Sequence, residues 1–100
     1  MQTSVILIDD HPLFRRGLSE LIKNTPQLKI AGQFADADET RAWLKSGDHA
    51  DVALLDRSLH DGDGLDLVPE LKRRGIKVVM LTIAEEDHEI LDAIERGVDG

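Results

Sequence analysis

The sequence predicts an α/β fold built on a parallel sheet. Three observations support this fold class. Strand-like aliphatic runs alternate with helix-like segments, most of these runs end in polar residues, and no repeat or low-complexity segment interrupts the order. Alternation of this kind favours parallel strands joined by right-handed helical crossovers. Because 100 residues form one small domain at most, we expect a single unit with the order βαβαβαβα.

The first strand is expected at residues 4–8, where the run Ser-Val-Ile-Leu-Ile is almost wholly aliphatic. Such a run is typical of a strand that is covered on both faces. Pro12 then suits the first turn of a helix, because the N–H that proline lacks has no intrahelical partner there. Apolar residues recur at helical spacing between residues 14 and 22, and the segment 24–26 ends this helix.

The second strand is expected at residues 28–32. It is followed by a helix with apolar residues between positions 37 and 44, which either Asp36 or Asp38 can cap. The third strand, at residues 52–55, is another buried type of run and ends in Asp56. Residues 61–64, Asp-Gly-Asp-Gly, form a turn by composition. These segments provide the second unit and the start of the third.

The third helix is expected to begin with Asp66 as its N-cap. Pro69 then falls at the third helical position, where no intrahelical N–H is needed. A fourth buried strand covers residues 78–81 and ends in Thr82. A fourth helix follows within residues 85–97, because the acidic residues at its start are favoured by the helix dipole.

Composition excludes several classes of function. The formal net charge is −8, from 12 Lys and Arg against 20 Asp and Glu, which argues against binding DNA, RNA or an anionic membrane by the chain's own field. The chain contains no cysteine, which excludes disulfides, thiol nucleophiles and cysteine-based metal sites. It has neither ~18 consecutive apolar residues nor a signal peptide, so we expect a cytoplasmic protein.

Polar residues stand at the carboxyl ends of three expected strands: Asp9 and Asp10, Asp56, and Thr82. In an open parallel sheet, ligands bind at this edge. If the first and third strands are neighbours, the three carboxylates converge, and they repel one another unless a cation is present. Acidic oxygen ligands suit Mg²⁺. A hard cation beside a free carboxylate is an arrangement for phosphoryl transfer.

Three segments, in chain order, resemble bacterial response-regulator receiver domains of the LuxR type (NarL/FixJ-like), which precede a helix-turn-helix. Residues 8–18 resemble the family's opening, residues 51–56 followed by Asp63-Gly64 resemble its phosphoacceptor segment, and residues 78–82 resemble its switch strand. The resemblance covers the whole chain. It implies a flavodoxin-like, doubly wound parallel sheet with strand order 2-1-3-4. It also implies that residues 1–100 are a C-terminally incomplete receiver, with four of the family's five strand–helix units.

The resemblance also implies roles for individual residues. Asp56 would accept a phosphoryl group from the phosphohistidine of a sensor histidine kinase, and Thr82 would act as the switch residue. Asp10 would bind Mg²⁺ directly, Asp9 would bind it through water or assist, and the backbone carbonyl of Ser58 would be a further ligand. The domain would be a signalling module rather than an enzyme, and would reach DNA only through a C-terminal domain that is absent from these residues.

Some features leave alternatives open. Residues 57–60 are Arg-Ser-Leu-His where the family usually has Leu-x-Met-Pro, which puts the stiffness of this loop in question. The family's lysine is absent from residues 1–100, so a pseudo-receiver that is not phosphorylated is the main alternative. A flavodoxin-like nucleotide or flavin binder is disfavoured, because residues 9–12 do not form a phosphate cradle.

Two further expectations concern an edge strand and the histidines. The family's sheet order implies that residues 78–81 form an apolar edge strand, flanked only by Lys77, which the family's fifth strand would cover. We therefore expect residues 1–100 either to be a fragment of a longer regulator or to self-associate through this region, by sheet extension, face packing or exchange of a terminal element. The four histidines show no spacing typical of metal ligands, and His11 is expected simply to start the first helix.

Overall fold

The computed structural model describes residues 2–56 and 58–81, with the backbone alone for Ser58. The elements are, in chain order, β1 (Thr3–Ile8), α1 (Pro12–Lys23), β2 (Leu28–Phe34), α2 (Ala37–Lys45), β3 (Val52–Asp56), β4 (Ser58–Leu59), β5 (Gly62–Asp63), the 3₁₀ helix η1 (Gly64–Leu67), α3 (Val68–Arg73) and β6 (Lys77–Leu81). Within this part of the chain, none of the helices has the length and apolar character that crossing a bilayer requires.

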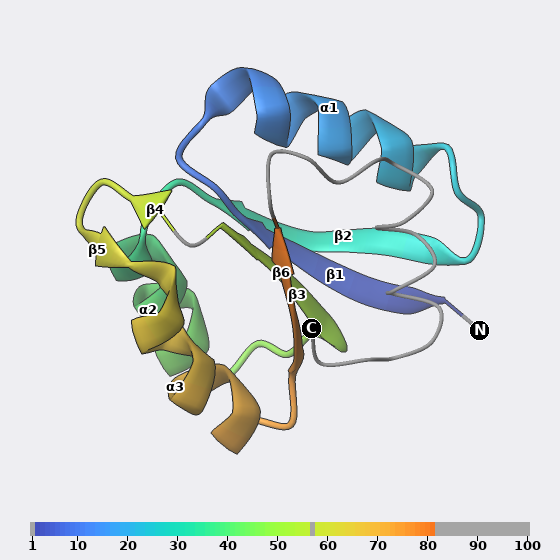
Figure 1. The fold of residues 1–100 in the computed structure, drawn as a ribbon. Coiled ribbons are helices and arrows are strands. Elements are labelled where there is room, and N and C mark those ends of the chain that lie inside the picture. Colours follow the sequence, from blue (N-terminus) through green and yellow to red (C-terminus); the bar gives the residue numbers. More distant parts are fainter. Residues whose placement is uncertain (1, 57, 82–100) are drawn as a thin grey trace.

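The main sheet is parallel and has the order β2-β1-β3-β6. This confirms the predicted order 2-1-3-4, because β6 is the fourth parallel strand. The short strands β4 and β5 pair with each other as a separate antiparallel ribbon. Figure 1 shows α1 on one face of the sheet and α2 with α3 on the other, as in a doubly wound fold.

The sheet separates two apolar cores, because successive residues of a strand point to opposite faces. In β1, Val5 and Leu7 pack in the core beneath α1, whereas Ile6 and Ile8 pack in the core beneath α2 and α3. All four side chains are fully buried. A strand covered on both faces has to be apolar at every position, which explains the continuous aliphatic runs in the sequence.

Strand β2 runs on to Phe34, two residues beyond the predicted end at Gly32. Its register against β1 shifts between Val5 and Ile6, so that Ile6 pairs with Gly32. A Cβ added to Gly32 would lie only 2.7 Å from the ring of Phe34, so glycine prevents a clash at this position. The extension matters for the edge of the sheet, because the Phe34 carbonyl accepts a hydrogen bond from the backbone N–H of Asp9 at 3.0 Å.

The start of the third helical segment differs from the prediction. Asp63, not Asp66, is the cap: its side chain accepts from the Leu65 N–H at 2.9 Å, and the chain turns at once into η1. Asp66 therefore lies inside η1, and α3 follows with Pro69 in its first turn, where proline is tolerated. The predicted fourth helix, within residues 85–97, lies outside the described residues.

At the amino edge of the sheet, Asp51 is bound closely to Ser4. One Asp51 carboxylate oxygen accepts from the Ser4 N–H at 2.9 Å and from the Ser4 hydroxyl at 3.1 Å. The Asp51 N–H in turn donates to Ser4. These bonds, led by the one from the Ser4 N–H, lower the pKa of Asp51. The pair fixes the start of β3 against β1.

Candidate metal centre at the carboxyl edge of the sheet

The acidic residues predicted to converge do so. Asp9 and Asp10 follow β1 and Asp56 ends β3, and these two strands are direct neighbours, with Ile8 paired to Leu55. One side-chain ligand atom from each of Asp9, Asp10, Asp56 and His11 lies within 4.8 Å of all the others. Parallel pairing therefore brings residues that are far apart in the sequence to one point on the edge.

Asp9 is the buried member of this acidic cluster, with 1% of its surface exposed. Its Oδ1 accepts a hydrogen bond from the His11 N–H at 2.7 Å, and its carbonyl accepts one from the Arg15 guanidinium at 2.7 Å. Together with the bond to Phe34, these contacts fix Asp9 in place. The pKa of Asp9 is nevertheless raised, first by burial and then by the charge of Asp56, against the lowering effect of the bonds from His11.

Two carboxylate oxygens of the cluster are buried and accept no hydrogen bond from the described residues: Asp9 Oδ2 and Asp10 Oδ1. His11 Nδ1 lies 3.1 Å from Asp10 Oδ1 as an ion-pair contact, but it does not donate a hydrogen bond to this oxygen. Buried polar atoms in native proteins are almost always satisfied. A divalent cation would satisfy both oxygens and offset the repulsion among the three acids. Few, acidic oxygen ligands suit Mg²⁺ in particular, so these residues fit the predicted ion.

His11 is a member of the cluster that the sequence reasoning missed. As predicted it starts the first helix, since it occupies the N-cap position of α1, but it makes no side-chain cap there. Its Nδ1 instead lies 3.1 Å from carboxylate oxygens of Asp9 and Asp10 and 3.3 Å from one of Asp56. The hydrogen bond to Asp9, and then the charge of Asp10, raise the pKa of His11. The one signal in the sequence was its position directly after the acid pair.

The structure describes the remaining predicted site residues only in part. Ser58 lies in β4, two residues beyond Asp56, and its backbone pairs with Asp63 in β5. The role of its carbonyl as a ligand stays a prediction. Thr82 and Arg57 lie outside the described residues.

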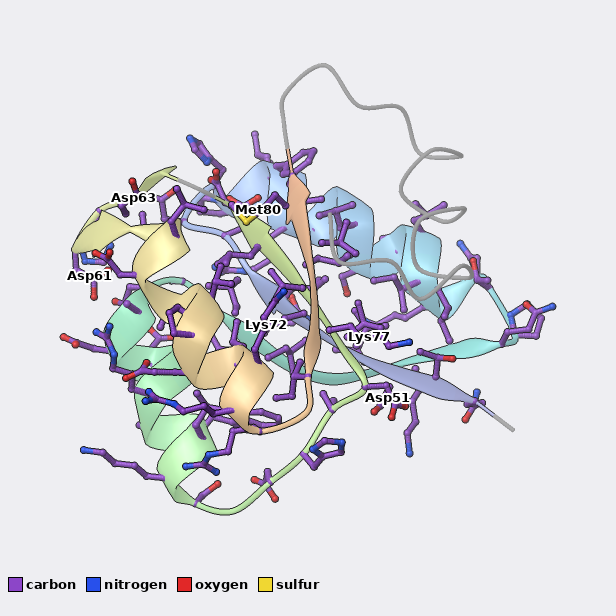
Figure 2. All side chains as sticks on the ribbon, turned by 60° about the horizontal axis from the view of Figure 1, so that its bottom comes forward. Asp51, Asp61, Asp63, Lys72, Lys77 and Met80 are labelled. Atoms are coloured by element: carbon purple, nitrogen blue, oxygen red, sulfur yellow. The ribbon has the colours of Figure 1, made fainter. Side chains whose placement is uncertain are left out.

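The loop that follows Asp56 is anchored to α2, a contact that the sequence did not reveal. The Asp61 carboxylate accepts from the Ala37 N–H at 3.1 Å and from the Asp38 N–H at 3.2 Å. The bond from Ala37 is the main cause that lowers the pKa of Asp61. His60 Nε2 lies 3.6 Å from a carboxylate oxygen of Asp36, the N-cap of α2. Figure 2 shows Asp61 and Asp63 at the other end of the sheet from Asp51.

This anchoring bears on the unusual sequence of the loop. The family's proline is replaced by His60, so the loop lacks that source of stiffness. In its place, the Asp61 carboxylate accepts from two of the N–H groups in the first turn of α2, which have no partner inside the helix. The position of the loop is therefore coupled to the position of α2.

Comparison with known proteins relates the chain to the receiver domains of response regulators. A family model described as response regulator receiver domain matches residues 5–100. Over 98 residues the chain is 37% identical to the DNA-binding transcriptional activator DevR/DosR of Mycobacterium tuberculosis, covering 96% of the chain and 45% of that protein. Over 99 residues it is 27% identical to the nitrate/nitrite response regulator protein NarL of Escherichia coli K12, covering 97% of the chain and 45% of that protein.

A solved structure of a receiver domain has a similar fold. The non-phosphorylated receiver domain of the stress response regulator RcsB from Escherichia coli matches with a TM-score of 0.72 and 25% identity, covering 97% of this chain and 76% of that one. The chain spans less than half of the length of the two curated relatives.

Proposed function

The chain belongs to the response regulator receiver domain family, and from this premise we propose that it is a phosphorylation-controlled receiver with Asp56 as its phosphoacceptor. The observation that carries the proposal is the convergence of Asp9, Asp10 and Asp56 at the carboxyl ends of two adjacent parallel strands. Two buried carboxylate oxygens there have no hydrogen-bond partner among the described residues, which supports a cation at this point.

We assign the Mg²⁺ ligands to Asp9, Asp10, Asp56 and the backbone carbonyl of Ser58. Bound Mg²⁺ would neutralise the charge that develops on the phosphoryl oxygens during transfer. Asp9 is buried and held by four hydrogen bonds, so it keeps the acid pair oriented toward Asp56. Its fixed position reduces the reorganisation that transfer requires.

Asp56 provides the nucleophile. Its side chain is 18% exposed, so a phosphodonor can reach it from solvent. In the proposed step a carboxylate oxygen of Asp56 attacks the phosphorus of a phosphohistidine in a sensor histidine kinase. The P–O bond forms as the P–N bond breaks, the histidine leaves with a proton, and Asp56 carries an acyl phosphate.

The output that we propose for the domain is supported by the name of one relative. One relative is named a DNA-binding transcriptional activator, and the chain spans 45% of its length. We propose that in a longer protein the receiver controls transcription through a C-terminal helix-turn-helix, with Thr82 as the switch residue. Self-association through the edge of β6, the last strand of the described sheet, also stays a proposal. Sedimentation across a concentration series would show larger species, whereas a strictly monomeric chain would contradict it.

The experiment is phosphorylation by acetyl phosphate, followed by intact-mass measurement. With Mg²⁺ the chain should gain the mass of one phosphoryl group, and Asp56→Asn should gain none. Asp66→Asn, the same change at an exposed position in η1, should label like the original chain. Removal of Mg²⁺ with a chelator should stop labelling. If the original chain fails to label, the pseudo-receiver that binds partners without phosphorylation becomes the better interpretation.

A further inference from the structure

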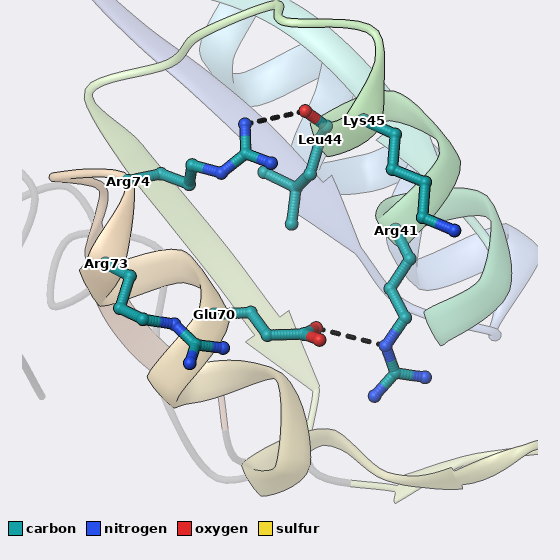
Figure 3. A pocket seen from close by; sticks show the side chains of 6 residues that line it. All are labelled: Arg41, Leu44, Lys45, Glu70, Arg73 and Arg74. Atoms are coloured by element: carbon teal, nitrogen blue, oxygen red, sulfur yellow. Dashed lines mark hydrogen bonds and ion pairs between the residues drawn. The ribbon is translucent and has the colours of Figure 1, made fainter.

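A groove of about 300 Å³ lies between α2 and α3, outside the acidic cluster. Figure 3 shows the six side chains that line the groove. Three belong to α2, two belong to α3 and one belongs to the residue after α3: Arg41, Leu44, Lys45, Glu70, Arg73 and Arg74. Four of these six side chains are cations and one is an acid, so the lining has a formal charge of +3. The chain as a whole carries −8, with 12 basic and 20 acidic residues. The groove is therefore a local reversal of the chain's charge.

The cations of the groove are not all neutralised. Arg41 Nε donates to Glu70 Oε2 at 3.0 Å, and Arg74 donates to the Leu44 carbonyl near the end of α2 at 2.7 Å. Lys45 and Arg73 form no ion pair or side-chain hydrogen bond with any described residue. Favourable interaction with the helix dipole accounts for cations in the last turns of α2 and α3. It does not account for Arg41, which lies in the middle of α2 and faces α3.

The contact between Arg41 and Glu70 indicates which kind of ligand suits the groove. Glu70 places a carboxylate against the Arg41 guanidinium, the pairing for which the planar donors of arginine are suited. The groove thus holds one carboxylate of its own, with Lys45 and Arg73 available beside it. A ligand with several carboxylates in an extended arrangement would satisfy these remaining cations.

We propose that this groove is a docking surface for an acidic segment of a partner protein. Its mostly charged lining differs from the apolar walls of typical small-molecule pockets. A nucleic acid is disfavoured because its long phosphate backbone would meet the field of a chain with net charge −8. The proposal uses no residue of the acidic cluster, so it stands or fails independently of phosphorylation at Asp56.

The test measures fluorescence anisotropy of a labelled peptide of alternating glutamate and serine residues, titrated with the chain at low salt. We expect binding that weakens as salt is added, because exposed charge pairs are screened. The same peptide with glutamine in place of glutamate should not bind. Glu70→Gln should tighten binding, because it removes the one acid of the groove and releases Arg41.

Arg73→Glu should weaken binding by about fivefold or more, as expected for loss and reversal of one exposed charge pair. Lys23→Glu is the matched control, because it reverses a cation in the last turn of α1, away from the groove. Circular dichroism melts should show that both variants are folded, and Arg73→Gln should weaken binding by less than Arg73→Glu.

Three results would overturn the proposal. Equal weakening by Arg73→Glu and Lys23→Glu would mean that the peptide senses only total charge. Equal binding of the glutamine peptide would remove the role of carboxylates. Tighter binding of an oligothymidine than of the glutamate peptide would make the partner a nucleic acid.

Discussion

His11 Nδ1 lies 3.3 Å from Asp56 Oδ2, although one residue follows β1 and the other ends β3. The contact exists because β1 and β3 are adjacent and parallel, so that the residues at their carboxyl ends meet. The same nitrogen lies 3.1 Å from oxygens of Asp9 and Asp10. The imidazole therefore shares the carboxylates that we assign to Mg²⁺, and the cluster combines three acids with one group that can become a cation.

The first prediction concerns Asp10. Mg²⁺ should raise the melting temperature of the chain, because a ligand that binds only the native state stabilises it, by about 2.7 kcal/mol when the free ion is at 100 times its Kd. Asp10→Ala should abolish this rise, while increasing stability without the ion because one of three repelling charges is gone. Thermal melts with and without Mg²⁺ measure both effects. An unchanged response to Mg²⁺ in the variant would remove Asp10 from the ligand set.

The second prediction concerns His11. Because its nitrogen contacts all three carboxylates, it competes with a cation for them. His11→Ala should tighten Mg²⁺ binding, measured by titration of the ion against Trp43 fluorescence or by calorimetry. His49→Ala, a change at an exposed residue before β3, should leave the affinity as it is. Weaker binding by His11→Ala would mean that the imidazole is itself a ligand rather than a competitor.

The third prediction concerns the anchoring of the loop to α2. Asp61→Asn should speed hydrogen exchange at the Ala37 and Asp38 amides, because the charged acceptor of both N–H groups is lost. Exchange measured by mass spectrometry or NMR reports this locally. Asp66→Asn, the same change in η1, should leave both amides protected. Unchanged exchange in Asp61→Asn would show that the loop does not hold the start of α2.

The fourth prediction concerns pH. The folded-state pKa of Asp51 lies below its ordinary value of 3.8, chiefly because of the bond from the Ser4 N–H. The stabilisation it gives is thus fully present above pH 3.8 and is lost as pH falls through the lower folded-state value. Asp51→Asn should lower the free energy of unfolding by about 1 kcal/mol at neutral pH, allowing for solvent screening.

Urea unfolding across the acidic range provides the check on Asp51. The difference in unfolding free energy between the original chain and Asp51→Asn should shrink as pH drops below 3.8. A difference that stays constant with pH would show that the ionised carboxylate is not what stabilises the start of β3.

Much of the fold could be predicted because it depends on local patterns. The strands were located by continuous aliphatic runs, such as residues 4–8, which only a strand covered on both faces needs. The convergence of the acids then follows from the order of the parallel strands. Asp9 comes directly after one such run and Asp56 ends another, and these two strands are neighbours. These inferences need no knowledge of individual side-chain contacts.

The features that the sequence did not predict depend on strand pairing, on a local choice between two suitable residues, and on contacts between distant residues. The alternation of residues 28–32 predicts an end at Gly32, but β2 pairs with β1 as far as Phe34. The register shift opposite Val5 and Ile6 is a property of the strand pair, not of either strand. The sequence predicts Asp66 as the cap, whereas Asp63 holds that position in the structure; aspartate suits a cap at either place, and only the turn into η1 distinguishes them. The hydrogen bonds that the Asp61 carboxylate accepts from α2 span 24 and 23 positions of the sequence, and no sequence motif marks them.

The central claim is that Asp56 accepts the phosphoryl group, and mapping the modified residue tests it most directly. After treatment with acetyl phosphate and Mg²⁺, borohydride reduces an aspartyl phosphate to homoserine, which tandem mass spectrometry locates in the sequence. The account predicts homoserine at position 56 alone. Homoserine at position 9 or 10, or a phosphoryl group that survives borohydride on another kind of side chain, would contradict it.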